Sequence, residues 1–239
     1  MLIKDLMEML RLPRAVVNLM SEKTAENDPF YARVVQDFYR EASARHPKLL
    51  LAKKYEYGFT LCKLPKDFNA YFMEVEASAR RNYRKAIRLG YRMTRFDFNT
   101  YLNDVRDIWL STPIRQGELL PEDIRTGQVT RIKDPPSWTP YHDYPYFGIF
   151  KEEKLLAYAG CLVSGELCNL NDIYGHTQYQ GDSVVPLLII EIARVLIEFY
   201  PNVKYYSYGT YFGASDSMQR FKRKFLFNPH HVKWVLGTP

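Results

Sequence analysis

The segment that most constrains the fold is DSVVPLLIIEIARVLIEFYP, residues 182–201. Its length and spacing predict a helix, and apolar side chains cover nearly every face apart from Glu191, Arg194 and Glu198. A helix that is apolar all round is buried inside a protein rather than laid on its surface. The segment therefore predicts the central helix of a layered α/β domain.

Strand-like segments surround this helix in the sequence. Residues 146–175 predict an antiparallel meander of three strands, with short turns at Glu152-Glu153 and Ser164-Gly165. VKYYSYG (203–209) predicts another strand, residues 215–225 a helix, and HHVKWVL (230–236) a last strand. The order of strands, buried helix, strand, helix and strand predicts an α/β fold with a mixed sheet flanked by helices.

The first half is mainly helical in pattern. The expected elements are one kinked or two short helices over 3–20, a helix over 28–46, a strand over 55–64, a single helix over 67–90, a strand over 91–96 and a helix over 99–110. Residues 112–145 carry six prolines and predict a long loop, which is typical of a lid or binding segment. We expect a helical extension, residues 1–50, packed on a core domain, residues 51–239.

Composition limits the function classes. The chain has 239 residues, of which 46% are apolar, and a net charge of +6, so it is an ordinary globular protein with a possible polyanionic partner such as RNA, DNA or a phosphorylated small molecule. Its three cysteines have no C-x-x-C spacing and predict reduced core thiols. No apolar run approaches the ~20 residues of a membrane span, and no signal-peptide block is evident, so we expect a cytoplasmic protein without membrane contact.

The order of elements resembles the core of the GNAT acyltransferases. Their loop motif, Q/R-x-x-G-x-G/A, is half present in HTQYQGDSVV (176–185): Gln180 fills the Q/R position, while Ser183 and Val185 replace the two small residues. Asp182 adds a negative charge where an anion would bind. The resemblance implies acyl-CoA in a notch between two splayed strands and a set of cofactor-binding residues. That set is Ile173, Tyr174, Gln180, Gly181, Ser183 and Val184.

Two further segments resemble the Fem family of aminoacyl-tRNA-dependent transferases, relatives of the GNAT enzymes. ARRNYRKAIRLGYRM (79–93) is similar to their basic helix, and YYSYGTYFGASDSMQRFKRKFLFNP (205–229) to their C-terminal segment, with Leu226 at a position usually held by a small residue. The resemblance covers residues 68–234 in patches. It implies aminoacyl-tRNA as a second possible donor.

In the C-terminal helix of this segment, the apolar side chains predict an inward face and the basic ones an outward face. The inward set is Met218, Phe221 and Phe225, and the outward set is Arg220, Lys222, Arg223 and Lys224. The glycine-bracketed turn before the helix places Tyr208 and Tyr211 at a strand end. By the GNAT resemblance, either tyrosine is a candidate acid for the leaving group. The alternative is that both are structural.

The remaining site predictions concern a base and the substrates. Asp172 is the candidate general base for an attacking amine, and a polar strand edge is the alternative. Arg84 and Arg88, in a ridge with Arg80, are candidate phosphate ligands rather than a merely solvated face. Arg115, with Gln116, is a candidate ligand of an acceptor carboxylate or phosphate, against an exposed loop arginine.

Several catalytic motifs are absent from the sequence, namely H-E-x-x-H, G-x-S-x-G, the P-loop and cysteine–histidine metal spacing. The leading hypothesis is a metal-free acyltransferase. It would move an acyl or aminoacyl group from a thioester, on CoA or a carrier protein, or from aminoacyl-tRNA to an amine on a peptide, a small molecule or a modified nucleobase. The alternative is a catalytically degenerate GNAT-fold module that binds nucleic acid through its basic face.

Overall fold

The computed structural model describes residues 9, 11–23, 28–46, 52–111, 114, 115, 118–133 and 139–237. These residues form a nine-stranded mixed sheet in the order β1-β11-β2-β10-β9-β8-β7-β3, with β6 paired to β8. The strands of this sheet are β1 (Arg14–Asn18), β2 (Tyr57–Lys63), β3 (Arg92–Arg95), β6 (His142–Asp143), β7 (Tyr146–Lys151), β8 (Lys154–Ser164), β9 (Leu167–Gly175), β10 (Tyr205–Thr210) and β11 (Asn228–Val235).

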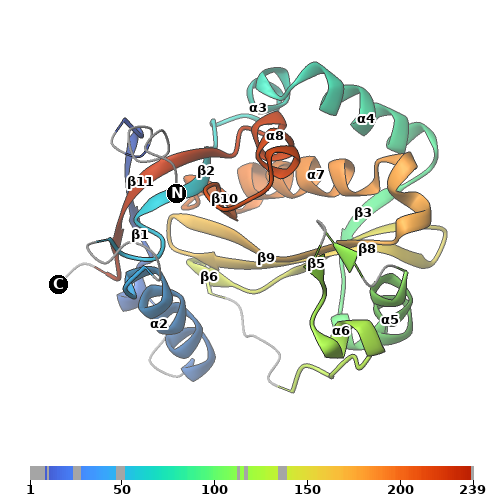
Figure 1. Ribbon diagram of the computed structural model, residues 1–239, viewed down its shortest axis with the longest axis horizontal. Coiled ribbons are helices and arrows are strands. Elements are labelled where there is room, and N and C mark those ends of the chain that lie inside the picture. The colour runs from blue at the N-terminus through green and yellow to red at the C-terminus, as the bar shows by residue number, and fades with distance from the viewer. Residues whose placement is uncertain are drawn as a thin grey trace.

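Helices cover both faces of the sheet (Figure 1). One face carries α3 (Phe68–Glu74), α4 (Ala77–Arg88), α7 (Val184–Phe199) and α8 (Asp216–Lys224). The other face carries α2 (Pro29–Ser43), α5 (Leu102–Leu110) and α6 (Glu122–Thr126). Short 3-10 helices are η1 (Ser21–Lys23), η2 (Phe98–Thr100) and η3 (Thr177–Asp182), and a separate hairpin pairs β4 (Ile114–Arg115) with β5 (Glu118–Leu119).

Helix α7 lies at the centre of the domain, as its apolar sequence predicts. Its buried side chains pack between the sheet and α4, in one core with residues of β8 and β9. The polar positions face α4: Tyr83 donates a hydrogen bond to Glu191 at 2.5 Å and accepts one from Arg194 at 2.8 Å. These contacts pair the two half-buried charged side chains of α7 with α4, although the buried Nε of Arg194 has no hydrogen-bond partner among the described residues.

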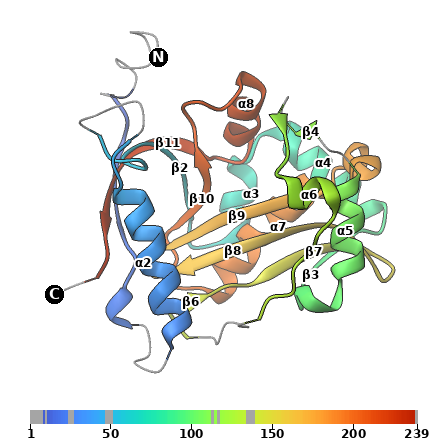
Figure 2. The ribbon, with the colours of Figure 1, turned by 60° about the horizontal axis from the view of Figure 1, so that its bottom comes forward.

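The opposite face is covered at its two ends. Figure 2 shows α2 at one end, α5 and α6 at the other, and β8 and β9 between them. Asp28 caps α2 by accepting a hydrogen bond from the amide of Tyr31, as the sequence predicts. Phe38 of α2 packs edge-on against Trp234 of β11 at 5.3 Å between ring centroids. The middle of this face is therefore left to the side chains of β7, β8 and β9.

Three expectations of secondary structure are wrong. Residues 14–18 form strand β1, which pairs in parallel with β11, where a helix was expected. The helix expected over 67–90 is broken into α3 and α4 around Val75, because the amide of Glu76 bonds to the carbonyl of Lys224 rather than continuing the helix. The long loop expected over 112–145 contains β4, β5, α6 and β6; residues 112, 113, 116, 117 and 134–138 lie outside the described residues.

The cysteines agree with the expectation of reduced core thiols. Cys62, Cys161 and Cys168 are all buried and free of disulfides. Burial raises the pKa of Cys62 to about 12, which keeps its thiol protonated and inert at neutral pH. Within the described residues, no helix has both the length and the apolar character that a bilayer crossing requires.

Candidate functional site

The central feature of the sheet is the divergence of two parallel neighbours, β9 and β10. They pair from Leu167 and Tyr205 as far as Asn169 and Ser207, and beyond these residues they separate. Strand β9 also bulges at Asn171, where its register against β8 shifts. Bulges and strand separations expose backbone groups that a regular sheet would pair. The result is a notch at the carboxyl ends of β9 and β10, as the GNAT resemblance implies.

A pocket of 540 Å³ opens at this notch. It lies where β9, β10, α4, α5, η3, α7 and α8 converge. Its lining residues are Asn82, Ile108, Trp109, Leu120, Tyr174, Gly175, Thr177, Gln180, Ser183, Val185, Pro186, Tyr208, Met218 and Phe221. Most of these side chains are apolar or aromatic, with a few polar groups, as is usual for a small-molecule or cofactor site.

The first turn of α7 forms one wall of the pocket. Ser183, the N-cap residue, has φ +69°, in the left-handed region that favours glycine. Glycine, which the GNAT motif has at this position, adopts such a conformation without the strain that serine incurs. The amides of Val184 and Val185 begin the helix and have no intrahelical acceptor, whereas Pro186 supplies no amide. The start of α7 thus offers two backbone N–H groups to an anion, one fewer than a helix without proline in its first turn.

Close packing holds this turn against the end of β9. A Cβ added to Gly175 would lie 2.7 Å from Cγ2 of Val185, so glycine is required where the strand passes the helix. The bulk of Val185, which the sequence comparison marks as a departure from the motif, is therefore accommodated by the missing side chain of Gly175.

The carboxylate of Asp182 does not line the pocket, and its charge is balanced by neighbouring side chains. Tyr91 donates a hydrogen bond to it at 2.6 Å, and the ammonium of Lys85 lies 3.9 Å from its other oxygen. Lys85 also donates a hydrogen bond to the carbonyl of Gly181 at 2.7 Å. Burial, followed by the bond to Asp182, raises the pKa of Tyr91. The negative charge expected to repel an anion is therefore balanced from α4.

A buried lysine lies behind the notch. Lys222 is 6% exposed, so the expectation that it lies on the outward face of α8 is wrong. Its ammonium donates a hydrogen bond to the carbonyl of Thr210 at 2.6 Å and lies 5.1 Å from the ring centroid of Tyr208. Burial lowers the pKa of Lys222 to about 8. Helical periodicity was the signal that could have found it, because Met218, Lys222 and Phe225 are spaced i, i+4 and i+7 on one face.

Hydrogen-bonded polar side chains cross the sheet where the strands separate. Ser207 donates to Asn169 at 2.7 Å, Asn169 to Asn171 at 2.5 Å, and Asn171 to the hydroxyl of Tyr144 at 2.8 Å. The next residue, Asp172, is exposed on the α5 side of the sheet. This row of bonds connects the notch to the opposite, partly open face.

The structure brings together four of the predicted site residues: Tyr174, Gln180, Ser183 and Tyr208 line the notch pocket. The others lie elsewhere, or present only backbone to the site. The side chains of Ile173, Val184 and Tyr211 are buried, Gly181 is bound to Lys85, and Asp172 belongs to the other face. Arg115 lies in β4 but its side chain is outside the described residues, as is all of Gln116.

The predicted basic ridge forms part of a wider basic surface. Arg81, Arg84 and Arg88 line a shallow hollow on α4 with Tyr83 and Ile87. Among the described residues, no carboxylate lies within 4.0 Å of these three guanidinium groups. Arg80, expected in the same ridge, instead points to the sulfur of Met73. The exposed residues Arg220 and Arg223 of α8 extend the surface, since the end of α8 abuts the start of α4.

Comparison with protein-family models and with curated proteins finds no match. Solved structures with a similar fold include FemX, at 11% identity and a TM-score of 0.56, covering 76% of this chain and 61% of that one. They also include a tandem GNAT protein from the clavulanic acid biosynthesis pathway, at 14% identity and 0.46, covering 86% and 57%. The C-terminal domain of an assigned lysylphosphatidylglycerol synthetase from Agrobacterium fabrum matches at 16% identity and 0.47, covering 73% and 58%.

The chain thus shares its fold with FemX, and the expected resemblance is confirmed at the level of fold. It spans about three fifths of the length of these three proteins.

Proposed function

We propose that this protein is an acyl or aminoacyl transferase that holds its donor in the notch between β9 and β10 and transfers the group to an amine. The observation that carries the proposal is the separation of these strands beyond Asn169 and Ser207, beside the bulge in β9 and the free-facing amides of α7. A notch of this form can hold an extended chain and polarise a carbonyl with backbone N–H groups.

The proposed reaction is a single acyl transfer. The acceptor nitrogen, deprotonated by Asp172 directly or through one water, attacks the carbonyl carbon and forms a C–N bond. The carbonyl electrons move to oxygen, which the backbone of β9 near its bulge stabilises. As the tetrahedral intermediate collapses, the C–S or C–O bond to the donor breaks, and Tyr208 supplies a proton to the leaving atom. The Lys222 ammonium near the Tyr208 ring favours negative charge there.

The donor in this proposal carries phosphate. Gln180, Ser183 and the amides that open α7 are suited to one phosphate group, and Arg81, Arg84 and Arg88 to several more at the rim. CoA thioesters and aminoacyl-tRNA both meet this requirement. The large basic surface and the small number of amides at α7 favour a donor with phosphates spread over a wide area, as in tRNA.

Two glycine variants test whether the notch holds the donor. Gly175→Ala places a methyl group 2.7 Å from Val185 and disturbs the notch wall, whereas Gly181→Ala is a matched control because no atom lies within 4 Å of its added Cβ. Thermal unfolding is measured for both variants and the parent with acetyl-CoA and with an aminoacyl-RNA hairpin. A bound donor at 100 times its dissociation constant adds ~2.7 kcal/mol to the unfolding free energy.

We expect one of the two donors to raise the melting temperature of the parent and of Gly181→Ala, and to raise that of Gly175→Ala much less. A shift of equal size in all three proteins would place the donor outside the notch. No shift with either donor, together with no transfer to amines, would refute the proposed function.

The basic surface favours a second function, nucleic-acid binding without catalysis. Its test is the double variant Arg84→Ala with Arg88→Ala, measured for RNA affinity at several salt concentrations. Loss of two phosphate contacts reduces the slope of log affinity against log salt by about 2. A change of this size in a protein that transfers no acyl group from either donor would favour the binding module over the enzyme.

A further inference from the structure

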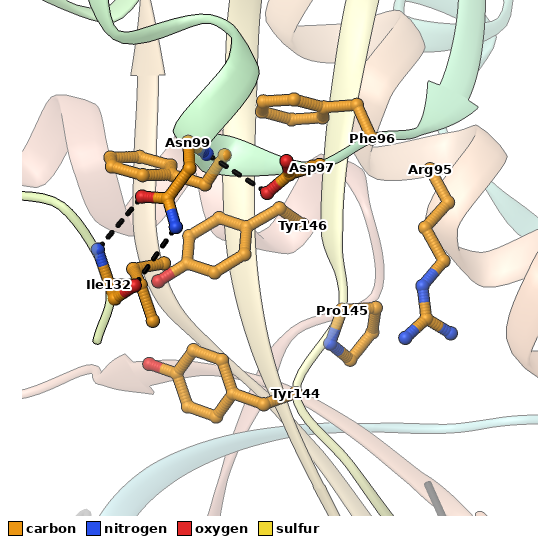
Figure 3. Close-up of a pocket in the computed structure, with 9 residues that line it drawn as sticks. Arg95, Phe96, Asp97, Asn99, Ile132, Tyr144, Pro145 and Tyr146 are labelled. Carbon is orange, nitrogen blue, oxygen red and sulfur yellow. Dashed lines mark hydrogen bonds between the residues drawn. The ribbon is translucent and has the colours of Figure 1, made fainter. Parts of the chain in front are cut away.

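The face of the sheet opposite α7 contains a second pocket, of 460 Å³, beside the row of polar side chains that leaves the notch. Aromatic rings form most of its wall: Phe96, Phe98, Tyr144 and Tyr146. Figure 3 shows the hydroxyl ends of Tyr144 and Tyr146 pointing the same way, toward Ile132, and away from Arg95. We call this the aromatic pocket.

The wall of the aromatic pocket is held in place by local contacts. The side-chain amide of Asn99 donates to the carbonyl of Ile132 and accepts from its amide, both at 2.9 Å, which fixes the segment after α6 over the pocket. The ring centroids of Phe98 and Tyr146 are 4.8 Å apart, and those of Tyr144 and Tyr146 are 5.8 Å apart. The cavity is therefore built by the fold before any ligand arrives.

Among the residues that line the pocket, the charge that is left without a counter-ion is negative. Arg95 lines it, but both of its terminal nitrogens bind the buried carboxylate of Asp143, at 2.7 and 2.9 Å, so this cation is already neutralised. Asp97 also lines the pocket and accepts hydrogen bonds from an amide and a hydroxyl, with no lysine or arginine within 4.0 Å among the described residues. An organic cation is favoured in such a setting, and an anion is not.

Register in the sheet connects this pocket with the reaction centre. Tyr146 pairs with Gly160, and Gly160 pairs with Asp172, so the three residues lie side by side on neighbouring strands and share a face. Gly160 has no side chain to separate the tyrosine from the carboxylate. A Cβ at this position would lie 3.0 Å from Cε1 of Tyr146. Asp172 is also near enough to raise the pKa of Tyr146, after the larger effect of burial.

We infer that the aromatic pocket binds the acceptor, and that the acceptor is a primary amine carried on a ring-sized apolar body. The ring would lie against Tyr146 and Phe98, and its ammonium would point toward Asp172, next to the bulge of β9 where the notch meets this face. The pocket and the notch then deliver acceptor and donor from opposite faces of the sheet. This inference rests on the proposed function for the meaning of the acceptor, but the binding it predicts can be measured without a donor.

Three ligands of similar size test whether the pocket selects a positive charge. They are benzylamine, benzyl alcohol and benzoate, and their affinities are measured by ligand-observed NMR titration. We expect benzylamine to bind about fivefold more tightly than benzyl alcohol, since an ion pair of its ammonium with Asp172 contributes roughly 1 kcal/mol. Benzoate is not expected to bind. Equal affinities for the cation and the alcohol, or binding of benzoate, would overturn the inference.

Three variants locate the site. Tyr146→Leu and Asp172→Asn each weaken benzylamine binding about fivefold or more, and Gly160→Ala weakens it by pressing a methyl group against the Tyr146 ring. The matched control is Tyr57→Leu, whose ring stacks on His231 at the far end of the sheet and which leaves binding unchanged. If Tyr146→Leu fails to fold, the other two variants carry the test. Unchanged binding in all folded variants would overturn the inference.

The two proposals fail independently. Donor binding, measured by thermal unfolding, is unaffected in Tyr146→Leu if the aromatic pocket serves the acceptor alone. The acceptor site would be refuted, and the transferase proposal kept, by one pair of results. The donor raises the melting temperature and acyl groups are transferred to amines, but benzylamine affinity is unchanged in the Tyr146 and Asp172 variants. If benzylamine affinity falls in the variants as expected but neither donor binding nor acyl transfer is detected, the transferase proposal is refuted and the pocket is a cation-binding site.

Discussion

Replacement of Lys222 by methionine is expected to stabilise the protein. Lys222 is 6% exposed, and burial lowers the pKa of its ammonium to about 8 from the ordinary 10.5. The unfolded chain therefore binds a proton more tightly than the folded one, and folding at pH 7 with the lysine charged costs about 3 kcal/mol. Methionine fills similar space without a charge, but the bond to the carbonyl of Thr210 is lost, at about 1 kcal/mol. The expected net gain is about 2 kcal/mol.

The pH dependence of this gain identifies its cause. Between pH 8 and 10.5 the unfolded state holds a proton that the folded state has released, so the stability of the parent rises with pH. The advantage of Lys222→Met is thus largest below pH 8 and shrinks by about 1 kcal/mol between pH 7 and pH 9. Urea unfolding of parent and variant at both values measures it, and other titrating groups cancel in the difference.

A control variant on the same helix separates burial from loss of charge. Arg220 is exposed on α8, so Arg220→Met is expected to change the unfolding free energy by no more than about 0.5 kcal/mol at either pH. If Lys222→Met destabilises the protein, or if its gain is the same at pH 7 and pH 9, the reasoning about a buried, charged lysine is wrong. A stabilised variant that has lost acyl transfer would indicate that the lysine is retained for function at the expense of stability.

Three other perturbations have definite expected outcomes. Ser183→Gly relieves a left-handed backbone and should raise the unfolding free energy by about 0.5–1 kcal/mol, whereas Ser183→Ala should not; urea unfolding of both checks this. Asp143→Asn breaks the two hydrogen bonds from Arg95 and weakens the hydrogen bond from Tyr200. It should lower the unfolding free energy by about 2–3 kcal/mol, and an unchanged melting temperature would contradict this expectation. Burial lowers the pKa of His142, so the unfolded state takes up its proton first and stability should fall as pH drops below about 6.5; His142→Gln should reduce this fall in acid unfolding curves.

The sequence predicted the central elements of the fold because their signals are local. Helix α7 is apolar on nearly every face, α2 has a capping aspartate followed by proline, and the strands of the meander are separated by clear turns. The break between α3 and α4 has no such signal: no proline or glycine stands at Val75 or Glu76. It depends on a backbone bond from Glu76 to Lys224, about 150 residues away, which local sequence cannot reveal.

The site was predictable in part, for a related reason. Tyr174, Gln180, Ser183 and Tyr208 line one pocket, because strand order fixes which loops meet at the notch, and their roles stay predictions. The run of basic residues in α8 predicts one solvated face that includes Lys222, but helical spacing puts Lys222 among the apolar side chains, where it is buried. The aromatic pocket was missed altogether. Its residues come from β3, η2, β7 and the segment after α6, and only sheet register brings them beside Asp172.

The two sequence resemblances, to the GNAT loop and to the Fem basic helix, meet in one structural unit. The loop before α7 departs from its motif by a carboxylate, Asp182, which would by itself weaken an anion site at the helix start. Helix α4 offsets this charge through Lys85, whose ammonium lies 3.9 Å from the carboxylate and donates a hydrogen bond to the carbonyl of Gly181. Its outer side keeps Arg84 and Arg88 available to solvent. A basic helix packed against an acidic loop thus restores a positive rim to the notch, and neither segment could provide that rim alone.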